Sequence, residues 1–159
     1  MSEDDFDHRY MRRAIELSYI ATKKGNFPFG AVIVKNGSVV AEGENRYWTD
    51  NDPTGCAEMV AMRNAGKMLK SPDLSGCVVY ASCEPCAMCV GAMFFAKVSG
   101  VCYGIPRARA NKYFDTSGQF EAISKPIDHR WIPAKNLCAH EAWKVMEEWA
   151  GPAAVAEQT

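Results

Sequence analysis

The chain is poor in histidine, has no long apolar run and carries no excess of positive charge. It has three histidines in 159 residues, and none stands at a spacing typical of a metal site. No window approaches the roughly 18 apolar residues that a membrane span needs, and no Lys- or Arg-rich run accompanies the net charge of −1. These absences disfavour a histidine metal site, a transmembrane helix and a nucleic-acid partner held by electrostatics.

The start of the chain is acidic rather than apolar. Residues 3–7 contain four carboxylates, and no hydrophobic segment of a secretory signal follows them. We therefore expect a cytoplasmic protein. The length is that of one ordinary domain, so residues 1–159 are expected to form a single domain, with its core at about 8–150 and a flexible tail at 151–159.

Cysteine, in contrast, is plentiful. There are seven, at positions 56, 77, 83, 86, 89, 102 and 138. An odd number in a chain without a secretion signal favours free thiols, and it favours metal binding over disulfides. Cys77 and Cys102 lie in apolar, strand-like runs, where a thiol usually serves as a small buried hydrophobic group.

The first half of the chain shows clear periodicity. Apolar residues recur at helical spacing over residues 7–24 and again over 56–69. Between them, two strand-like runs at 30–35 and 38–42 flank an Asn-Gly pair, which tolerates the positive φ values of a type I′ turn. We predict a β-hairpin between two helices, with Cys56 at or near a helix start.

The second half alternates strand and helix before the pattern weakens. Residues 77–82 read as a strand, 87–96 as a buried helix with proline in its first turn, and 100–104 as a strand parallel to the previous one. Short helices and loops follow, until an amphipathic helix at 139–149. This order predicts an α/β fold.

Three thiols and one carboxylate stand where they could build a catalytic zinc site. Cys86 and Cys89 are one helical turn apart, and Cys56 precedes them by thirty residues, with Glu58 two residues further on. Three protein ligands leave the fourth position of zinc for water, and helix N-termini stabilise thiolates. Glu58 could then shuttle protons during hydrolysis by a metal-activated water.

A closed structural zinc knuckle is the alternative reading of the same cysteines. Cys83 lies three residues before Cys86 and could replace the water as fourth ligand. Against this, Cys83 falls at a strand end, and a chain with so much apolar sequence does not need a metal in order to fold. We therefore expect an open site.

The cysteine motifs resemble those of the cytidine-deaminase-like zinc hydrolases. Cys-Ala-Glu at residues 56–58 and Pro-Cys-Ala-Met-Cys at 85–89 match the paired signature of that superfamily. Within it, Phe-Pro-Phe-Gly at 27–30, Asn-Asp-Pro-Thr at 51–54 and Phe-Asp at 114–115 look most like bacterial guanine deaminases. The resemblance implies a three-layer α/β/α fold with a mixed, mostly parallel five-stranded sheet.

The resemblance also implies a role for each matching position. The zinc ligands would be Cys56, Cys86 and Cys89, with Glu58 as general acid and base. The substrate contacts would be Asn45, Phe29, Ala57 and Asp115. Three of these have a simpler alternative: Asn45 as a turn cap, Phe29 as core, and Asp115 as the cap of a short helix.

The function implied is zinc-dependent deamination of a free nucleobase, above all of guanine to xanthine and ammonia, by a homodimer. Guanine deaminases of this type usually carry histidine where this chain has Cys56, and the lost imidazole face could admit a smaller ring. Cytosine-like or s-triazine bases are therefore the first alternative. Two less favoured alternatives are a nucleoside deaminase and a tRNA adenosine deaminase. The least favoured is a zinc-stabilised binding module without turnover.

Overall fold

The computed structural model describes residues 3–151. The chain divides into two compact units, Met1–Phe120 and Glu121–Thr159, and every element that forms the sheet belongs to the first. The tail predicted at 151–159 falls almost entirely outside the described residues.

The sheet of the first unit has four strands in the order β2-β1-β3-β4. They are β1 (Gly30–Lys35), β2 (Ser38–Glu44), β3 (Cys77–Cys83) and β4 (Gly100–Ile105). Strand β1 is antiparallel to both β2 and β3, whereas β3 and β4 are parallel. The mixed α/β sheet is therefore confirmed, as is the parallel strand predicted at residues 100–104.

Two details of the predicted sheet differ. The described residues form four strands instead of five, and two of the three strand pairs are antiparallel. The cause is the path between β2 and β3. After the hairpin, the chain crosses over through a helix and places β3 beside β1 instead of beside β2. Strands β2, β3 and β4 thus share one direction, and the single reversed strand lies between two of them.

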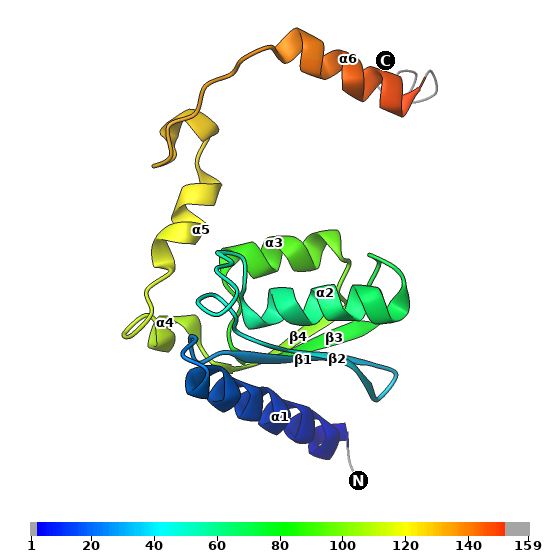
Figure 1. The fold of residues 1–159 in the computed structure, drawn as a ribbon, viewed down its shortest axis with the longest axis vertical. Coiled ribbons are helices and arrows are strands. Elements are labelled where there is room, and N and C mark those ends of the chain that lie inside the picture. The colour runs from blue at the N-terminus through cyan, green and yellow to red at the C-terminus, as the bar shows by residue number, and fades with distance from the viewer. Residues whose placement is uncertain (1–2, 152–159) are drawn as a thin grey trace. The chain divides into compact units, whose positions relative to one another are not determined.

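Helices cover both faces of this sheet. Figure 1 shows α1 (Glu3–Lys23) on one face, and α2 (Ala57–Leu69) with α3 (Ala87–Phe95) on the other. Successive residues of β1 point to opposite faces of the sheet. Val32 packs in the cluster under α1, and Ile33 packs in the cluster under α2 and α3. The predicted three-layer α/β/α arrangement is confirmed.

Most local signals of the sequence also hold. Asn36 and Gly37 both have positive φ, 51° and 72°, as a type I′ hairpin requires. All seven cysteines are free thiols. Cys77 is fully buried as predicted, whereas Cys102 is only half-buried because β4 is the edge strand.

The helix predicted at 87–96 departs from expectation in two respects. Helix α3 is buried on one face only, with Phe94 and Phe95 exposed. Pro85 lies before its N-cap residue Cys86 instead of in its first turn.

Short helices follow the sheet. They are α4 (Arg107–Ala110), α5 (Ser117–Ser124), the 3-10 helix η1 (Ile127–His129) and α6 (Ala139–Ala150). The last confirms the helix predicted at 139–149 and belongs to the second unit. Within residues 3–151, no helix combines the length and the apolar character needed to cross a bilayer.

Strand β2 and helix α2 touch backbone to backbone at Gly43. A Cβ atom placed on Gly43 would lie 2.3 Å from the carbonyl oxygen of Ala57 and 2.5 Å from the amide nitrogen of Ala61. The glycine therefore sets how closely the first turn of α2 approaches the sheet. Because Cys56 and Glu58 flank Ala57, this contact also positions two candidate site residues.

Gly43→Ala is expected to lower the free energy of unfolding by roughly 1–3 kcal/mol, since the added methyl group meets rigid backbone atoms. Urea denaturation measures the change. Gly91→Ala is the matched control, because a Cβ atom at Gly91 in α3 meets nothing within 4 Å. That variant should be neutral, or stabilising by up to about 1 kcal/mol. Equal effects of the two variants would show that the α2–β2 contact is not tight.

Candidate metal centre and cavity

Three cysteine thiols meet where two helices begin. Cys56 is the N-cap residue of α2, Cys86 is that of α3, and Cys89 lies in the first turn of α3. Their sulfur atoms all lie within 4.8 Å of one another, and the Sγ atoms of Cys86 and Cys89 are 3.6 Å apart. The helix starts expected from the sequence therefore bring together residues that are up to 33 positions apart.

This geometry suits a zinc ion. Zinc binds thiolates at about 2.3 Å in tetrahedral geometry, which puts two ligand sulfurs about 3.8 Å apart. The Sγ atoms of Cys86 and Cys89 already have nearly that spacing, and all three sulfurs lie within 4.8 Å of one another. Cys83 is not part of the cluster, which among residues 3–151 consists of three thiols. The donor set therefore fits a three-thiolate site with an open position better than a closed four-cysteine knuckle.

The thiols share their protons unequally. Hydrogen bonds from Cys56 and Cys89, supported by the backbone amides of Cys89 and Met88, lower the pKa of Cys86. The same interactions raise the pKa of Cys56 and of Cys89, which keep their protons. The cluster thus already stabilises one thiolate, and a cation would favour ionisation of the other two.

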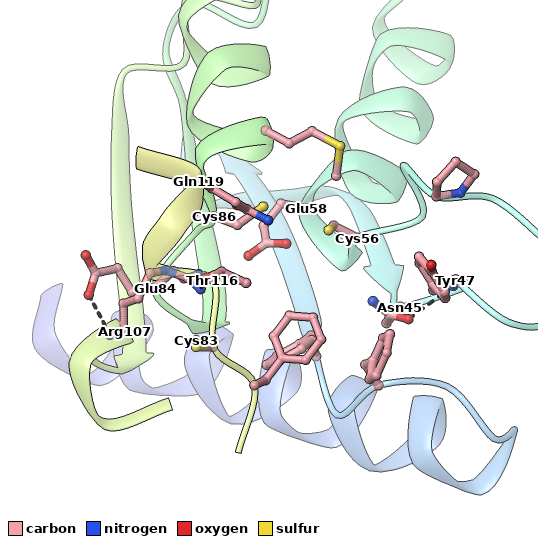
Figure 2. Close-up of a pocket in the computed structure, with 15 residues that line it drawn as sticks. Asn45, Tyr47, Cys56, Glu58, Cys83, Glu84, Cys86, Arg107, Thr116 and Gln119 are labelled. Atoms are coloured by element: carbon pink, nitrogen blue, oxygen red, sulfur yellow. Dashed lines mark hydrogen bonds between the residues drawn. The ribbon is translucent and has the colours of Figure 1, made fainter. Parts of the chain in front are cut away.

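The carboxylate of Glu58 contacts this cluster. Its side chain is buried, and its Oε2 lies 3.5 Å from Sγ of Cys89. Burial raises the pKa of Glu58 to about 7, and the positive charge of Arg107 partly opposes the rise. Figure 2 shows the carboxylate between Cys86 and Cys56, directed into a cavity. A carboxyl group of this kind can both take up and release a proton near neutral pH.

The cavity has a volume of about 140 Å³ and combines aromatic and polar walls. It is lined by Phe27, Phe29, Asn45, Tyr47, Pro53, Cys56, Glu58, Cys83, Glu84, Cys86, Met88, Arg107, Phe114, Thr116 and Gln119. All of these residues belong to the first unit. An apolar hollow with a few convergent polar groups is typical of a small-molecule site.

Aromatic rings form one wall of the cavity. Phe114 lies 4.7 Å from Phe27 and 5.4 Å from Phe29, measured between ring centroids, and Tyr47 lies 5.3 Å from Phe27. The rings are tilted by 54–59° to one another. Phe29 thus borders the cavity and also packs against the core. Such a wall can receive the flat face of a heterocycle.

Asn45 follows the end of β2 and is buried. Its Oδ1 accepts a hydrogen bond of 3.1 Å from the backbone N–H of Tyr47, so the residue does cap a turn. Figure 2 places the amide nitrogen on the side of the cavity that faces Cys56. The turn and the site are therefore compatible uses of one side chain, because the carbonyl fixes the orientation and leaves the NH₂ group as a donor.

Asp115 and Ala57 lie outside the lining of the cavity. Asp115 is exposed, and its Oδ1 accepts a hydrogen bond of 2.9 Å from the N–H of Ser117 at the start of α5. That bond lowers the pKa of Asp115. Ala57 is fully buried in the first turn of α2.

Several lining residues were missed by the sequence-based reasoning. They are Phe27, Tyr47, Pro53, Glu84, Met88, Arg107, Phe114, Thr116 and Gln119. Arg107, Thr116 and Gln119 come from the region after β4, where the Phe-Asp pair at 114–115 was the marked motif and periodicity was weak. Phe27 and Tyr47 flank predicted positions, and clustered aromatic residues beside Asn45 were the one signal that could have found them.

Two helix N-termini that hold three thiols and a carboxylate over an α/β sheet define a zinc hydrolase site. Residues 4–105 match the family described as the cytidine and deoxycytidylate deaminase zinc-binding region. This match covers more than half of the chain and includes all three thiols and Glu58. The chain therefore belongs to this deaminase family.

Relatives of known function lie within the same group. The guanine deaminase of Bacillus subtilis is 40% identical over 143 residues, which are 85% of this chain and 92% of that protein. The tRNA-specific adenosine deaminase of Buchnera aphidicola is 35% identical, over 73% of this chain and 72% of that protein. An X-ray structure of the B. subtilis guanine deaminase superimposes with a TM-score of 0.86 and 38% identity, covering 94% of each chain.

Metal analysis of the purified protein should give about one zinc per chain. Replacing Cys86 and Cys89 together with serine should abolish that zinc, because one thiolate cannot hold the ion alone. Cys83→Ala is the control, since Cys83 borders the cavity but lies outside the thiol cluster. Zinc that is retained in the double variant, or lost in Cys83→Ala, would contradict the three-thiolate assignment.

Proposed function

We propose that this chain hydrolyses a free nucleobase, converting guanine and water to xanthine and ammonia. The observation that carries the proposal is the contact between the buried carboxylate of Glu58 and the three-thiol cluster at the cavity. The likeness to B. subtilis guanine deaminase, over nearly the full length of both chains, supports guanine as the base.

The residues divide the chemistry between them. Cys56, Cys86 and Cys89 hold zinc, which supplies Lewis acidity and lowers the pKa of water. Glu58 accepts the proton released by the attacking water on its carboxylate. It passes that proton to a ring nitrogen, then takes the second proton of the same water from the hydroxyl group formed at the attacked carbon. It delivers this second proton to the amine, so that the C–N bond breaks and ammonia departs as a neutral molecule. A pKa raised by burial to about 7 suits a group that must act in both directions.

The remaining residues orient the base. Phe29 packs against the ring, and the NH₂ group of Asn45 donates to an acceptor on its edge. Asp115 and Ala57 complete the proposed contacts. Each lies in the chain between two residues that line the cavity, Asp115 between Phe114 and Thr116, and Ala57 between Cys56 and Glu58.

The identity of the base is the part of the proposal that Cys56 affects most. A thiolate offers no ring face to the substrate, so cytosine-like and s-triazine bases remain the competing substrates. A tRNA substrate is the further alternative, because tRNA-specific adenosine deaminases are also relatives. The net charge of −1 supports a small molecule instead, since tRNA binding normally uses a basic surface.

We also propose a homodimer that acts in the cytoplasm, with residues 1–159 working as one deaminase domain. Large apolar side chains on the surface support association, among them Phe94 and Phe95, which are 81% and 86% exposed. Seven free thiols support a reducing compartment. The match to B. subtilis guanine deaminase over 94% of both chains supports one functional domain.

Glu58→Gln should reduce ammonia release from guanine about 10²–10⁴-fold, because an amide cannot shuttle a proton. Zinc content should not change, since Glu58 is not among the thiol ligands. Glu16→Gln is the matched control, because Glu16 lies on the exposed side of α1, where it pairs with Arg13. A Glu58→Gln enzyme with full activity, or a wild-type protein that deaminates cytosine but not guanine, would refute the proposal.

Sedimentation equilibrium should give a mass twice that of the 17.6 kDa chain. The expected dimer follows from the exposed apolar surface, whose burial is favourable. A single species at 17.6 kDa over the whole concentration range would contradict the homodimer and would leave the proposed chemistry untouched.

A further inference from the structure

Arg107 borders the cavity and has no role in the proposed proton transfer. It opens the short helix α4 directly after β4, and its positive charge acts on Glu58 and on Cys83 across the cavity. Figure 2 shows it beside Glu84 and Thr116, on the wall formed by the segment after β4. A cation on the wall of a small-molecule site is placed to interact with a polar group of the bound molecule.

The guanidinium is fixed by neutral acceptors. One Nη atom donates to the backbone carbonyl of Glu84, and the other donates to the hydroxyl of Thr116. The carboxylate of Glu84 accepts instead the backbone N–H of Arg107, at 2.7 Å. Within residues 3–151, Arg107 makes no ion pair with a carboxylate. The side chain is thus held in place by neutral acceptors, while the carboxylate of Glu58 acts on its charge without a direct ion pair.

The guanidinium also has donors to spare. Its Nε is buried without a hydrogen-bond partner, the one such side-chain atom among the described residues. Each Nη atom carries two N–H groups, and the two hydrogen bonds above use one group of each. A buried donor without an acceptor is costly, and an under-satisfied cation at a cavity gains when these remaining Nη donors meet an electron-rich oxygen brought in by a ligand. Guanidinium groups that are held in place at a site bind such oxygens with strong geometric preference.

We propose that Arg107 binds a ring carbonyl oxygen of the substrate and so selects oxo-heterocycles over bases that lack this acceptor. The inference rests on the proposed function, because it places a nucleobase in the cavity. Arg107 recognises the oxygen of this carbonyl as a hydrogen-bond acceptor. A hydrogen or an amino group at the same position of the base offers the guanidinium no acceptor. Thr116 and Glu84 act as positioning residues, since they hold Arg107.

The test compares two ligands that differ in that oxygen. Guanine and 2-aminopurine carry the same 2-amino group, but 2-aminopurine has hydrogen where guanine has its ring carbonyl, and its adjacent ring nitrogen carries no hydrogen. Binding is measured at equilibrium on zinc-loaded Glu58→Gln protein, which avoids turnover. Adding Arg107→Gln should weaken guanine about 10- to 100-fold and leave 2-aminopurine unchanged. Arg107→Lys, which keeps the charge, should restore part of the guanine affinity.

Two controls separate selectivity from structure. Arg109→Gln changes the neighbouring exposed arginine of α4 and should affect neither ligand. Zinc content and the circular dichroism spectrum report whether each variant is folded. If Arg107→Gln does not fold, Arg107→Lys carries the test, with guanine weakened more than 2-aminopurine.

Weakening of both ligands by the same factor, or of neither, would overturn the proposal, because Arg107 would then only brace the loop after β4. Since binding is measured without turnover, the result is independent of the activity assay. A wild-type protein that releases no ammonia from guanine would refute the proposed function, and the ligand comparison would still decide the role of Arg107.

Discussion

The meeting of two helix N-termini is the constraint on which the rest of the site depends. Helices α2 and α3 lie on the same face of the sheet, and each begins with a cysteine. The unpaired amides and partial positive charge at such ends favour thiolates. Glu58, in the first turn of α2, is thereby held against Cys89 in a buried position where its proton affinity is raised. A shift of α3 relative to α2 would separate Glu58 from Cys89, because the two residues lie on different helices.

The sheet supplies the precision that this arrangement needs. Gly43 lets the backbone of α2 lie directly on β2, and the crossover through α2 returns the chain to β3, at whose end the second cysteine motif begins. The position of β3 beside β1 therefore sets the spacing between Cys56 and the Cys86–Cys89 pair. The cavity then forms between these helix starts and the aromatic residues on the loops around them, which include Phe29 and Phe114.

The sequence predicts those features of the structure that depend on residues close together in the chain, and it does not predict those that depend on distant ones. Local signals were sufficient for the hairpin at Asn36-Gly37 and for the helix starts at Cys56 and Cys86, because turn chemistry and periodicity act over a few residues. Strand order was not local: nothing in the sequence says that β3 inserts beside β1. Arg107 was likewise invisible, since its place on the cavity wall is created by contacts with Glu84 and Thr116, 23 and 9 positions away.

X-ray absorption at the zinc edge of the purified protein tests the central claim most directly, because it counts the atoms bound to the metal. The open site predicts three sulfur ligands at about 2.3 Å and one lighter ligand, oxygen, at about 2.0 Å. Four sulfur ligands would contradict the account. They would mean that Cys83 closes the site, that no position remains for water, and that Glu58 lies beside a structural metal.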